Sequence, residues 1–481
     1  MQLEQLISQL NPLQIRGDVE RDITSLQMDS RKVGPGCLFV ATVGTAVDGH
    51  DFIQKAIDGG AVAIVCERMP MKRDKQVCYI QVTDSAHALG LLADEWYGRP
   101  SASLTLVGVT GTNGKTTIAT LLYRLTHALG YKSGLLSTVV NYVDEEAVPA
   151  THTTPDPLEL NALLRRMVDA GCRYAFMEVS SHAVVQQRIA GLRFDGGIFT
   201  NLTRDHIDYH KTFEAYRDAK KAFFDQLPKG TFAVTNADDK NGAYMLQNTP
   251  ARHITYSTCR PADIRAQILE EGFEGMLLNL NGREIFVRLV GRFNVSNLMA
   301  IYGAATALGL PTDEVMRLLS TLTAVNGRFE AIHSPKGWTA IVDYAHTPDA
   351  LTNVINTINE IRPTESRLIT VVGCGGNRDK GKRPMMAHEA AIGSTQLVLT
   401  SDNPRDEDPN EILKDMLAGL TEEEIRNTLV IADRHEAIKT ACTIAQPKDV
   451  ILIAGKGHED YQIIKGIKHH FDDHEVVREF L

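Results

Sequence analysis

The chain lacks several features that would define its class at once. It has only seven cysteines, none in a Cys-x-x-Cys pair, so neither a disulfide framework nor a zinc site is expected. No apolar run reaches the roughly 18 residues of a membrane-spanning helix, and residues 1–5 lack a signal-peptide pattern. Long basic stretches are also missing, and the formal net charge is −10. We therefore expect a cytoplasmic protein that binds neither nucleic acid nor a membrane.

At 481 residues the chain is too long for one core, so several domains are expected. An amphipathic helix is predicted at 85–97, and Gly98-Arg99-Pro100 interrupts it. A new series of strands begins after Gly327-Arg328-Phe329. Apolar strand candidates alternate with helix-length stretches throughout, which predicts an α/β fold with parallel sheets. The expected domains are a small N-terminal α/β unit at 1–98, a central domain at 99–328 and a third α/β unit at 329–481.

Residues 109–117 read Val-Thr-Gly-Thr-Asn-Gly-Lys-Thr-Thr and directly follow the apolar run 104–109. A strand, a tight glycine loop and a helix at 118–128 are predicted, and such a loop directs backbone N–H groups at a phosphate. Lys115 is expected to pair with the outer phosphates, and the Thr116 hydroxyl to reach Mg²⁺. The loop is shorter than the general phosphate-loop pattern.

Polar groups follow two further predicted strands, at 175–179 and 197–201. Glu178 and His206 lie near the ends of these strands, where ligand groups collect in open parallel sheets. A carboxylate and an imidazole suit Mg²⁺ beside a nucleotide, although Mg²⁺ prefers oxygen. Two alternatives stay open: a pair of satisfied buried polar groups, or a zinc site in the Asp-His-x-Asp-x-His run at 205–210.

Two helical segments carry further candidates. Lys220 and Lys221 lie near the middle of a helix predicted at 216–224, and such a pair by itself indicates a solvated face. Asn294 and Asn297 are three residues apart, so they share one face of a second helix. They could reach a nucleotide, or they could be helix-capping amides.

Four loops in the last domain each follow a predicted strand, at 343–348, 373–384, 401–405 and 454–459. If the strands are parallel, these loops lie at one edge of the sheet and direct charged groups into a cleft. The glycines at 373–376 also fit a dinucleotide loop, but the arginine that follows favours recognition of a carboxylate or phosphate.

Together these motifs resemble the Mur ligase family, the ATP-dependent amide-forming enzymes of peptidoglycan precursor synthesis, over essentially the whole chain. The resemblance implies a UDP-binding N-terminal domain, a central ATPase-type domain, a Rossmann-like C-terminal domain, and ATP and Mg²⁺ as cofactors. For ATP it implies Gly111, Thr112, Asn113, Gly114, Lys115, Thr116, Thr117, Asn294, Asn297, Arg328 and Asp343. For Mg²⁺ it implies Thr116, Glu178, His206 and Lys220, the last as a carbamylated lysine. The implied catalytic residues are Lys115, Glu178, His206, Lys220, Arg328 and Asp343.

Residues 28–50, His152-Thr153-Thr154-Pro155 and Asp402-Asn403-Pro404-Arg405 resemble the members that add meso-2,6-diaminopimelate to UDP-N-acetylmuramoyl-L-alanyl-D-glutamate. For the nucleotide-linked substrate this implies Met28, Ser30, Thr45, Ala46, Val47, His152, Thr153, Thr154, Ser180, Gln186 and Arg188. For diaminopimelate it implies Arg378, Asp402, Asn403, Pro404, Arg405, Gly455 and Glu459. Arg405 would bind the distal carboxylate that lysine lacks, and Glu459 would hold an ammonium.

A monomer is expected. The ligands are split across domains, which suggests the hypothesis that the last domain closes and that Arg328 and Asp343 then contact the nucleotide. Alternatives are the same reaction with L-lysine, a folylpolyglutamate synthetase-like ligase, and a nucleotide switch without catalysis. A folate ligase would not need the domain at 1–98, and a switch would not need the charged loops around Arg378, Arg405 and Glu459.

Overall fold

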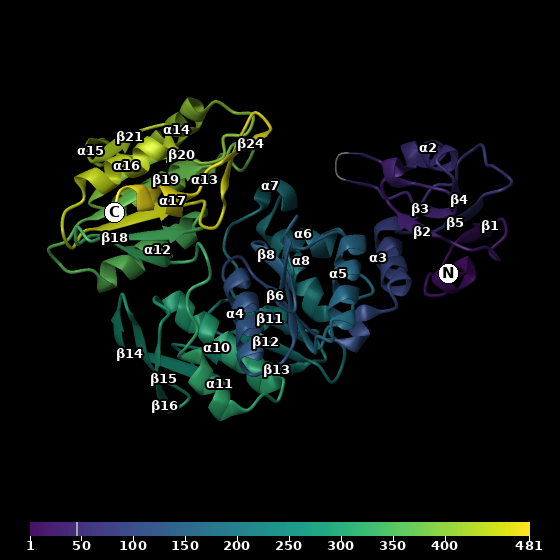
Figure 1. The fold of residues 1–481 in the computed structure, drawn as a ribbon, viewed down its shortest axis with the longest axis horizontal. Coiled ribbons are helices and arrows are strands. Elements are labelled where there is room, and N and C mark those ends of the chain that lie inside the picture. Colours follow the sequence, from purple (N-terminus) through teal and green to yellow (C-terminus); the bar gives the residue numbers. More distant parts are fainter. Residues whose placement is uncertain (45–46) are drawn as a thin grey trace.

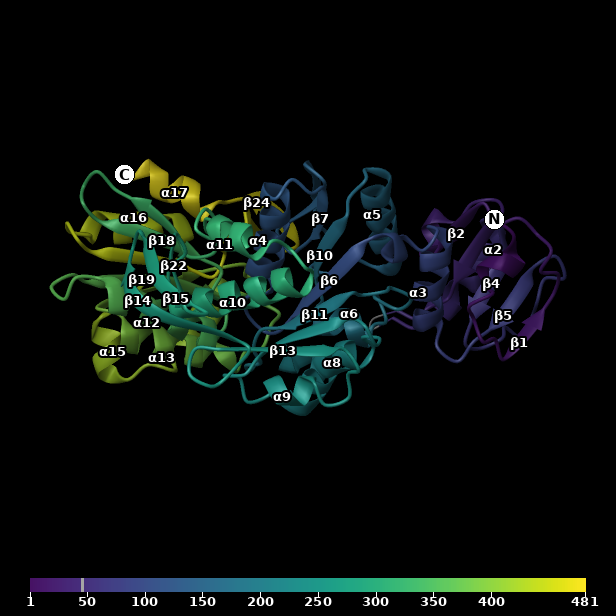
Figure 2. The same ribbon diagram turned by 90° about the horizontal axis from the view of Figure 1, so that it is seen from below.

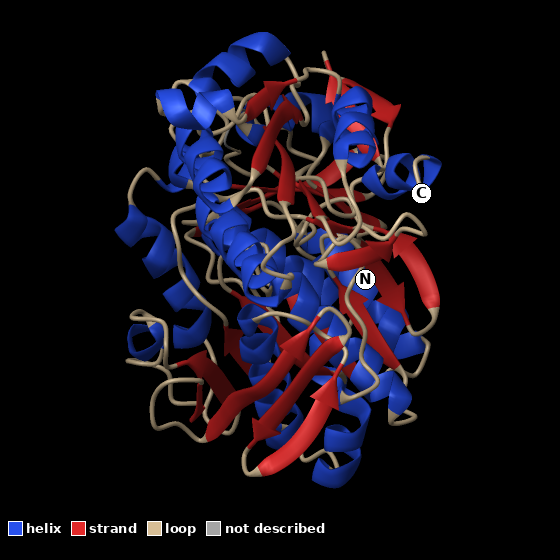
Figure 3. Ribbon diagram, turned by 90° about the vertical axis from the view of Figure 1, so that its left-hand side faces the viewer, coloured by secondary structure: helices blue, strands red, loops and turns tan. Residues whose placement is uncertain are grey.

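The computed structural model describes residues 1–44 and 47–481. Three lobes follow one another along the longest axis of the molecule (Figures 1 and 2). The N-terminal lobe stands at one end, and the C-terminal lobe lies against the central lobe at the other. In each lobe helices cover the faces of a sheet (Figure 3), as predicted for an α/β protein.

The N-terminal lobe is built on a five-stranded sheet in the order β1-β5-β4-β3-β2. Four of its strands are parallel, and β1 pairs antiparallel with β5 at one edge. The strands are β1 (Gln14–Arg16), β2 (Ser25–Gln27), β3 (Cys37–Val40), β4 (Ala61–Cys66) and β5 (Cys78–Gln81). The helical elements are α1 (Leu3–Leu6), η1 (Ser30–Lys32), η2 (Gly49–Phe52), α2 (Ile53–Asp58) and α3 (Ser85–Trp96). Apolar clusters on both faces of the sheet form the core.

The central lobe has an eleven-stranded sheet in the order β16-β15-β14-β13-β12-β11-β6-β10-β7-β8-β9. From β14 to β7 the neighbouring strands are parallel, as predicted. Its strands are β6 (Thr105–Thr110), β7 (Ser133–Leu136), β8 (Val140–Val143), β9 (Glu146–Pro149), β10 (Tyr174–Glu178), β11 (Gly196–Phe199), β12 (Phe232–Asn236), β13 (Arg252–Ser257), β14 (Ile264–Gly272), β15 (Gly275–Leu280) and β16 (Arg283–Val287).

Both edges of this sheet are antiparallel meanders, β7-β8-β9 and β14-β15-β16, which the sequence analysis did not predict. The physical reason is the length of the connections: a two-residue turn joins β15 to β16, whereas a parallel pair needs a long crossover.

Helices cover both faces of the central sheet. One apolar cluster packs α4, α10 and α11 on one face, and a second packs α5, α6 and α8 on the other. The helical elements are η3 (Pro100–Ser103), α4 (Lys115–Ala128), α5 (Pro157–Asp169), α6 (Ser181–Val185), α7 (Ile207–His210), α8 (Phe213–Asp225), α9 (Gly242–Met245), α10 (Arg292–Ala307) and α11 (Thr312–Leu319).

The C-terminal lobe has a six-stranded sheet in the order β17-β18-β22-β19-β20-β21, with only β17 antiparallel. The predicted parallel arrangement is therefore confirmed, and the four charged loops lie at one edge of the sheet. The strands are β17 (Glu330–His333), β18 (Thr339–Asp343), β19 (Leu368–Cys374), β20 (Gln396–Ser401), β21 (Thr428–Val430) and β22 (Val450–Ala454), with a separate hairpin of β23 (Tyr461–Ile464) and β24 (Ile467–His470). The helices are α12 (Pro348–Ile361), α13 (Lys382–Gly393), α14 (Pro409–Leu417), α15 (Glu422–Arg426), α16 (Arg434–Ile444) and α17 (Asp473–Glu479).

Two of the exclusions made from composition are also tested by the fold. All seven cysteines are free thiols, and every one except Cys259 is buried, which confirms the expectation of reduced thiols. Among the residues that the structure describes, none of the helices is long and apolar enough to cross a membrane.

Candidate active site

The glycine loop connects β6 to α4 in only four residues, Gly111 to Gly114. Both glycines have left-handed φ angles, +150° and +90°. A Cβ on Gly111 would lie 1.8 Å from the Thr200 hydroxyl oxygen, and one on Gly114 would lie 2.6 Å from Oδ1 of Asn297. Neither position therefore accepts a side chain without displacing its neighbours.

The helix after this loop begins at Lys115, not at residue 118 as predicted. Lys115, Thr116 and Thr117 thus form its first turn, where backbone N–H groups have no partner within the helix. This placement strengthens the phosphate site, because the N–H groups and the positive end of the helix dipole act together.

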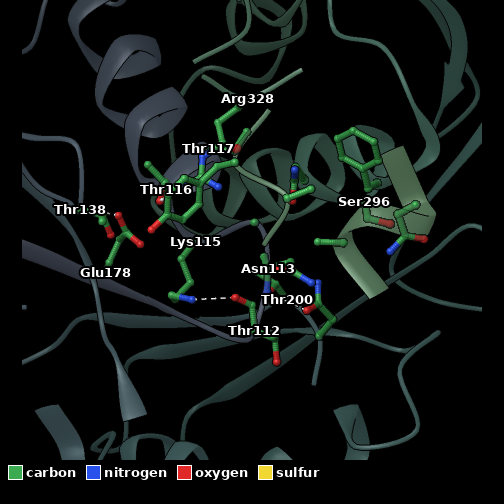
Figure 4. A pocket seen from close by; sticks show the side chains of 18 of the residues that line it. Thr112, Asn113, Lys115, Thr116, Thr117, Thr138, Glu178, Thr200, Ser296 and Arg328 are labelled. Atoms are coloured by element: carbon green, nitrogen blue, oxygen red, sulfur yellow. Dashed lines mark hydrogen bonds between the residues drawn. The ribbon is translucent and has the colours of Figure 1, made fainter. Parts of the chain in front are cut away.

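The Lys115 ammonium folds back onto its own loop, where it donates to the carbonyls of Gly111 at 2.9 Å and Thr112 at 2.8 Å (Figure 4). Burial lowers the pKa of Lys115, and Glu178 opposes that shift. A phosphate at the loop would supply the missing negative charge and favour the charged ammonium.

A cavity of about 300 Å³ opens beside the loop, and both the central and the C-terminal lobes line it (Figure 4). The predicted residues that it brings together are Thr112, Asn113, Gly114, Lys115, Thr116, Thr117, Thr153, Glu178, Ser180, His206, Lys220, Asn294, Asn297, Arg328 and Asp343. Gly111 is not among the lining residues. The cavity also includes Asp205, from the run at 205–210, and residues that the sequence analysis missed, among them Thr138, Thr200, Tyr216 and His346. Thr200 follows β11 directly, so the strand-end rule could have found it.

Lys220 is 1% exposed, and Lys221 beside it is also buried, so the interpretation of this pair as a solvated face is wrong. Helix α8 packs between α6 and the sheet, which buries this face. The Lys220 amine donates to the Gly111 carbonyl at 2.9 Å and lies 4.7 Å from the centre of the Tyr216 ring. Burial, with Lys115 nearby, lowers the pKa of Lys220 well below its usual value of 10.5.

Glu178, the last residue of β10, is 1% exposed. Its Oε1 accepts a hydrogen bond of 2.7 Å from the backbone N–H of Thr138, and Figure 4 shows the two side by side. A carboxylate oxygen at a strand end beside the phosphate loop fits the preference of Mg²⁺ for oxygen ligands.

The zinc interpretation of residues 205–210 is wrong: among the described residues, no group of three or more His, Cys, Asp or Glu side chains could hold a metal ion. The rings of His206 and His210 both pack against His182, with centroids 4.8 and 5.4 Å apart. His206 is 44% exposed and lies 3.4 Å from Asp205, whereas His210 is buried and hydrogen-bonded to the Ser181 hydroxyl at 2.9 Å.

Asn294 and Asn297 lie inside α10, whose N-cap is Gly291 without any side-chain cap, so the capping interpretation is wrong. Asn297 donates to the Oδ1 of Asn294 at 3.1 Å, and Asn294 donates to the Val290 carbonyl at 2.8 Å. Both amides are buried and line the cavity, as a nucleotide contact requires.

Two direct bonds reach the phosphate loop and the first turn of its helix, one from the boundary with the C-terminal lobe and one from that lobe. Arg328 donates to the Thr116 hydroxyl at 3.2 Å while its guanidinium lies 4.3 Å from the centre of the Tyr344 ring, and Asn113 donates to Asp349 at 3.2 Å. Asp343 is buried and accepts from the N–H groups of Phe329 and Ala345, each at 2.7 Å. Burial raises the pKa of Asp343, and Arg328 opposes that shift.

The residues expected to hold the muramoyl-dipeptide end form a connected cluster beside Glu178. Thr154 donates to the Glu178 carbonyl at 2.7 Å and accepts from the Ser180 N–H at 3.1 Å. Arg188 donates to the Thr154 carbonyl and to Gln186, both at 2.7 Å. Thr153 accepts from the Thr138 hydroxyl at 3.0 Å, and the exposed His152 contacts only Thr151 in the described structure, at 3.2 Å.

The residues expected to hold the amino acid lie on the strand-end loops of the C-terminal lobe, outside the cavity wall. Asn403 donates to Glu459 at 2.7 Å, and Arg405 donates to the Gly376 carbonyl at 2.8 Å. Burial and the nearby Asp402 raise the pKa of Glu459. Gly455, Pro404 and Arg378 belong to the same loops. The Tyr344 hydroxyl connects this group to the cavity because it donates to Glu459 at 3.5 Å.

The residues expected at the uridine end lie in the N-terminal lobe and do not line the cavity. Met28 follows β2, Ser30 is the first residue of η1, and Met28 and Val47 are exposed. Thr45 and Ala46 lie outside the described residues.

The fold and the cavity together define a three-lobed protein with a phosphate loop at a central sheet and a second α/β lobe over it. Family models match each lobe: "Mur ligase family, catalytic domain" at residues 22–97, "Mur ligase middle domain" at 109–305 and "Mur ligase, glutamate ligase domain" at 327–457. The chain belongs to the Mur ligase family, and it is an enzyme of the ligase class, as the sequence predicted.

Among its relatives is the UDP-N-acetylmuramoyl-L-alanyl-D-glutamate–2,6-diaminopimelate ligase of Phocaeicola vulgatus, 61% identical over 100% of this chain and 99% of the relative. A solved structure with the same ligase name is 33% identical, with a TM-score of 0.71 over 100% of this chain and 98% of the other. The folylpolyglutamate synthase of Mycobacterium tuberculosis, solved with ADP and AMPPCP, covers only 76% of this chain and 91% of its own, with a TM-score of 0.61 and 17% identity. It shares the fold.

Proposed function

We propose that this chain is an ATP-dependent amide ligase. It joins the amine of meso-2,6-diaminopimelate to the D-glutamyl γ-carboxylate of UDP-N-acetylmuramoyl-L-alanyl-D-glutamate in the cytoplasm. The observation that supports this most is the shared cavity, where a phosphate loop of one lobe faces the strand-end loops of another. The relatives that bear the name of this ligase agree with the proposal.

In the proposed reaction, the γ-carboxylate attacks the γ-phosphate of ATP, and an acyl phosphate and ADP form. The diaminopimelate amine then attacks the acyl carbon, loses its proton, and phosphate leaves. Lys115 and Arg328 are the cations that would stabilise charge on the transferred phosphate, since both line the cavity beside Thr116. The buried amides of Asn294 and Asn297 would orient the nucleotide.

The oxygen donors beside the loop fit Mg²⁺: the Thr116 hydroxyl and the Glu178 carboxylate, with His206 as a further candidate at the open side. Bound Mg²⁺ would neutralise phosphate charge. Lys220 fits this set only as a carbamate, because an amine is a poor Mg²⁺ ligand. Its neutral nitrogen would bond to the carbon of CO₂ and release a proton, which converts the amine into an anionic oxygen donor. Its lowered pKa favours that neutral form.

The amino acid would be selected at the edge of the C-terminal lobe. Arg405 would bind the distal carboxylate of diaminopimelate, and Glu459 would bind an ammonium. Lysine has only an ammonium at its distal end, so the Arg405 guanidinium would meet a like charge and would have no carboxylate partner. We propose the ranges 1–98, 99–328 and 329–481 as the three domains, which bind the uridine end, ATP and the amino acid, and a monomer as the working unit.

Phosphate release by the purified chain tests the proposal, with ATP, the UDP-linked dipeptide and one amino acid at a time. Turnover that depends on meso-diaminopimelate is the expected result. Equal turnover with L-lysine would contradict the role of Arg405. Turnover with a folate and glutamate would indicate a folylpolyglutamate synthetase, and ATP binding without any turnover would indicate a switch.

A further inference from the structure

The hairpin of β23 and β24 follows Glu459 by a single residue and pairs with none of the six strands of the C-terminal sheet. Lys465 and Gly466 form its two-residue turn, with φ angles of +49° and +76°, the pattern of a type I′ turn. Every residue of β24 is exposed. A cavity of about 530 Å³, lined by Pro404, Gln462, Ile464 and residues of α16 and α17, lies against the hairpin. Apolar packing therefore does little to hold the hairpin in place.

Backbone hydrogen bonds join the hairpin to Arg405 instead. The N–H of Arg405 donates to the Ile463 carbonyl at 2.9 Å, and the N–H of Lys465 donates to the Arg405 carbonyl at 2.7 Å. Arg405 has φ +52°, a conformation that non-glycine residues rarely adopt. Such a backbone is strained, so it persists only when its neighbours hold it. The hairpin supplies the two bonds that do so.

The hairpin also holds the residues before Arg405. Gln462 donates to the Asp402 carbonyl at 2.6 Å, and the N–H of Ile463 donates to the Asn403 side chain at 2.9 Å. Asn403 in turn donates to Glu459. Bonds of two consecutive hairpin residues, Gln462 and Ile463, and of the turn residue Lys465 thus reach three of the four residues 402–405.

A buried ammonium completes this connection. Lys456 is 0% exposed, and its Nζ donates to the Tyr461 carbonyl at the start of the hairpin. The same nitrogen lies 3.3 Å from Glu459 and 3.8 Å from Asp402. One cation therefore ties the first hairpin residue to both carboxylates of the amino-acid loops.

We propose that the hairpin of β23 and β24 is a specificity-determining element that positions Arg405, and that Gln462 is a positioning residue within it. This rests on the proposed function, because it takes Arg405 as the group that recognises a distal carboxylate. A guanidinium binds a carboxylate in a fixed planar geometry, so a misdirected Arg405 loses that carboxylate. An amino acid that ends in an ammonium gains nothing from Arg405, so a loosened hairpin lowers selectivity.

The test replaces the glycine of the turn, as Gly466→Val. A Cβ at Gly466 meets nothing within 4 Å, so the substitution acts only through the backbone φ of +76°. Gly282→Val is the matched control. Gly282 has φ +84° in the equivalent Asn281-Gly282 turn of the β15–β16 hairpin, also with nothing within 4 Å of its Cβ. The two variants carry similar local strain at different places.

For Gly466→Val we expect the KM for diaminopimelate to rise about tenfold and its kcat/KM relative to lysine to fall by a similar factor. The KM for ATP should stay within about twofold, because the phosphate loop is unchanged. Gly282→Val should leave all three values near wild type. Equal effects of the two variants, or an equal rise in both KM values of Gly466→Val, would overturn the proposal.

Gln462→Leu removes the hydrogen bond to the Asp402 carbonyl and leaves the turn intact, so it tests the proposal even if Gly466→Val does not fold. It should raise the KM for diaminopimelate alone, and it should have no further effect in an Arg405→Ala background, because it acts through Arg405. An undiminished effect in that background would reject a positioning role. If turnover by the wild-type chain does not depend on diaminopimelate, the proposed function and this inference are both rejected. If the wild type prefers diaminopimelate to lysine but the variants keep its KM values, only this inference is rejected.

Discussion

The two ends of the cleft are built in different ways. At the phosphate end, the loop and the first helix turn supply Thr112 to Thr117, which are consecutive in sequence and line the cavity. At the amino-acid end, the loops after β18, β19, β20 and β22 and a separate hairpin each supply a residue or two. The phosphate end is thus built from one continuous segment, whereas the amino-acid end is built from several segments that are distant in sequence. Damage to the first should therefore abolish the reaction, whereas damage to the second should change which amino acid is used.

The largest effect is expected for Gly111→Ala. Its Cβ would lie 1.8 Å from the Thr200 hydroxyl oxygen, so the loop or β11 must move and the phosphate N–H groups lose their direction. We expect kcat/KM for ATP to fall by about a hundredfold or more. Gly130→Ala is the control: Gly130 has φ +86° with nothing within 4 Å of an added Cβ, so it carries the strain without the clash. Equal kinetic loss in both variants would mean that backbone strain alone matters.

Lys220→Ala should be next, with activity lower by about a hundredfold, because it removes the proposed anionic oxygen donor beside the phosphates. A short carboxylate added to the assay should restore part of the activity. Lys221→Ala is the matched control, since Lys221 pairs with Asp225 at 2.5 Å and does not line the cavity. Full activity of Lys220→Ala would exclude the carbamate.

The same lysine predicts how stability changes with pH. Because the pKa of Lys220 is lowered on folding, the unfolded chain binds more protons between that lowered pKa and 10.5, and the free energy of unfolding rises with pH in this window. Lys220→Met should be more stable than the wild type at pH 7, and its advantage should shrink as the pH approaches 10.5. Urea unfolding in CO₂-free buffer measures this, and a pH-independent difference would contradict the buried neutral amine.

Arg405→Ala should change the choice of amino acid more than the use of ATP. Removal of a charge-assisted pair of about 1.5–3 kcal/mol corresponds to a loss of about tenfold to a hundredfold in kcat/KM for diaminopimelate. The KM for ATP, measured in parallel, should hardly change. A similar loss for both substrates would erase the difference between the two ends of the cleft.

The smallest effect is expected for Arg328→Lys, which keeps the charge but loses the planar contact with Tyr344 and the bond to Thr116. The KM for ATP should rise about threefold to tenfold, while the KM for diaminopimelate stays constant. Small-angle scattering with ATP and the UDP-linked dipeptide gives the second readout. If the variant still changes shape on binding as the wild type does, Arg328 does not couple the two lobes.

The sequence predicted those parts of the site that depend on residues close together in the chain. The phosphate loop, Glu178 at its strand end and the parallel strands of the C-terminal sheet follow from apolar runs and adjacent turn residues, because each depends on neighbours in the chain. For Lys220 and Lys221 the residues alone indicated a solvated face, and only the family resemblance pointed to Lys220, because the sequence does not show how α8 packs. The antiparallel edges of the central sheet were not predicted, and the zinc alternative at residues 205–210 could not be excluded, since strand pairing and side-chain direction depend on distant segments.

The order of strands, loops and charged residues along this chain determined its class, its three-part organisation and the family to which it belongs. Only the tertiary structure decided that Lys220 faces the phosphate loop, that Arg328 reaches Thr116 from the boundary with the C-terminal lobe, and that a hairpin beyond Glu459 holds Arg405. The physical reason is that periodicity and turn chemistry act over a few residues, whereas burial and long-range hydrogen bonds exist only after the elements have packed.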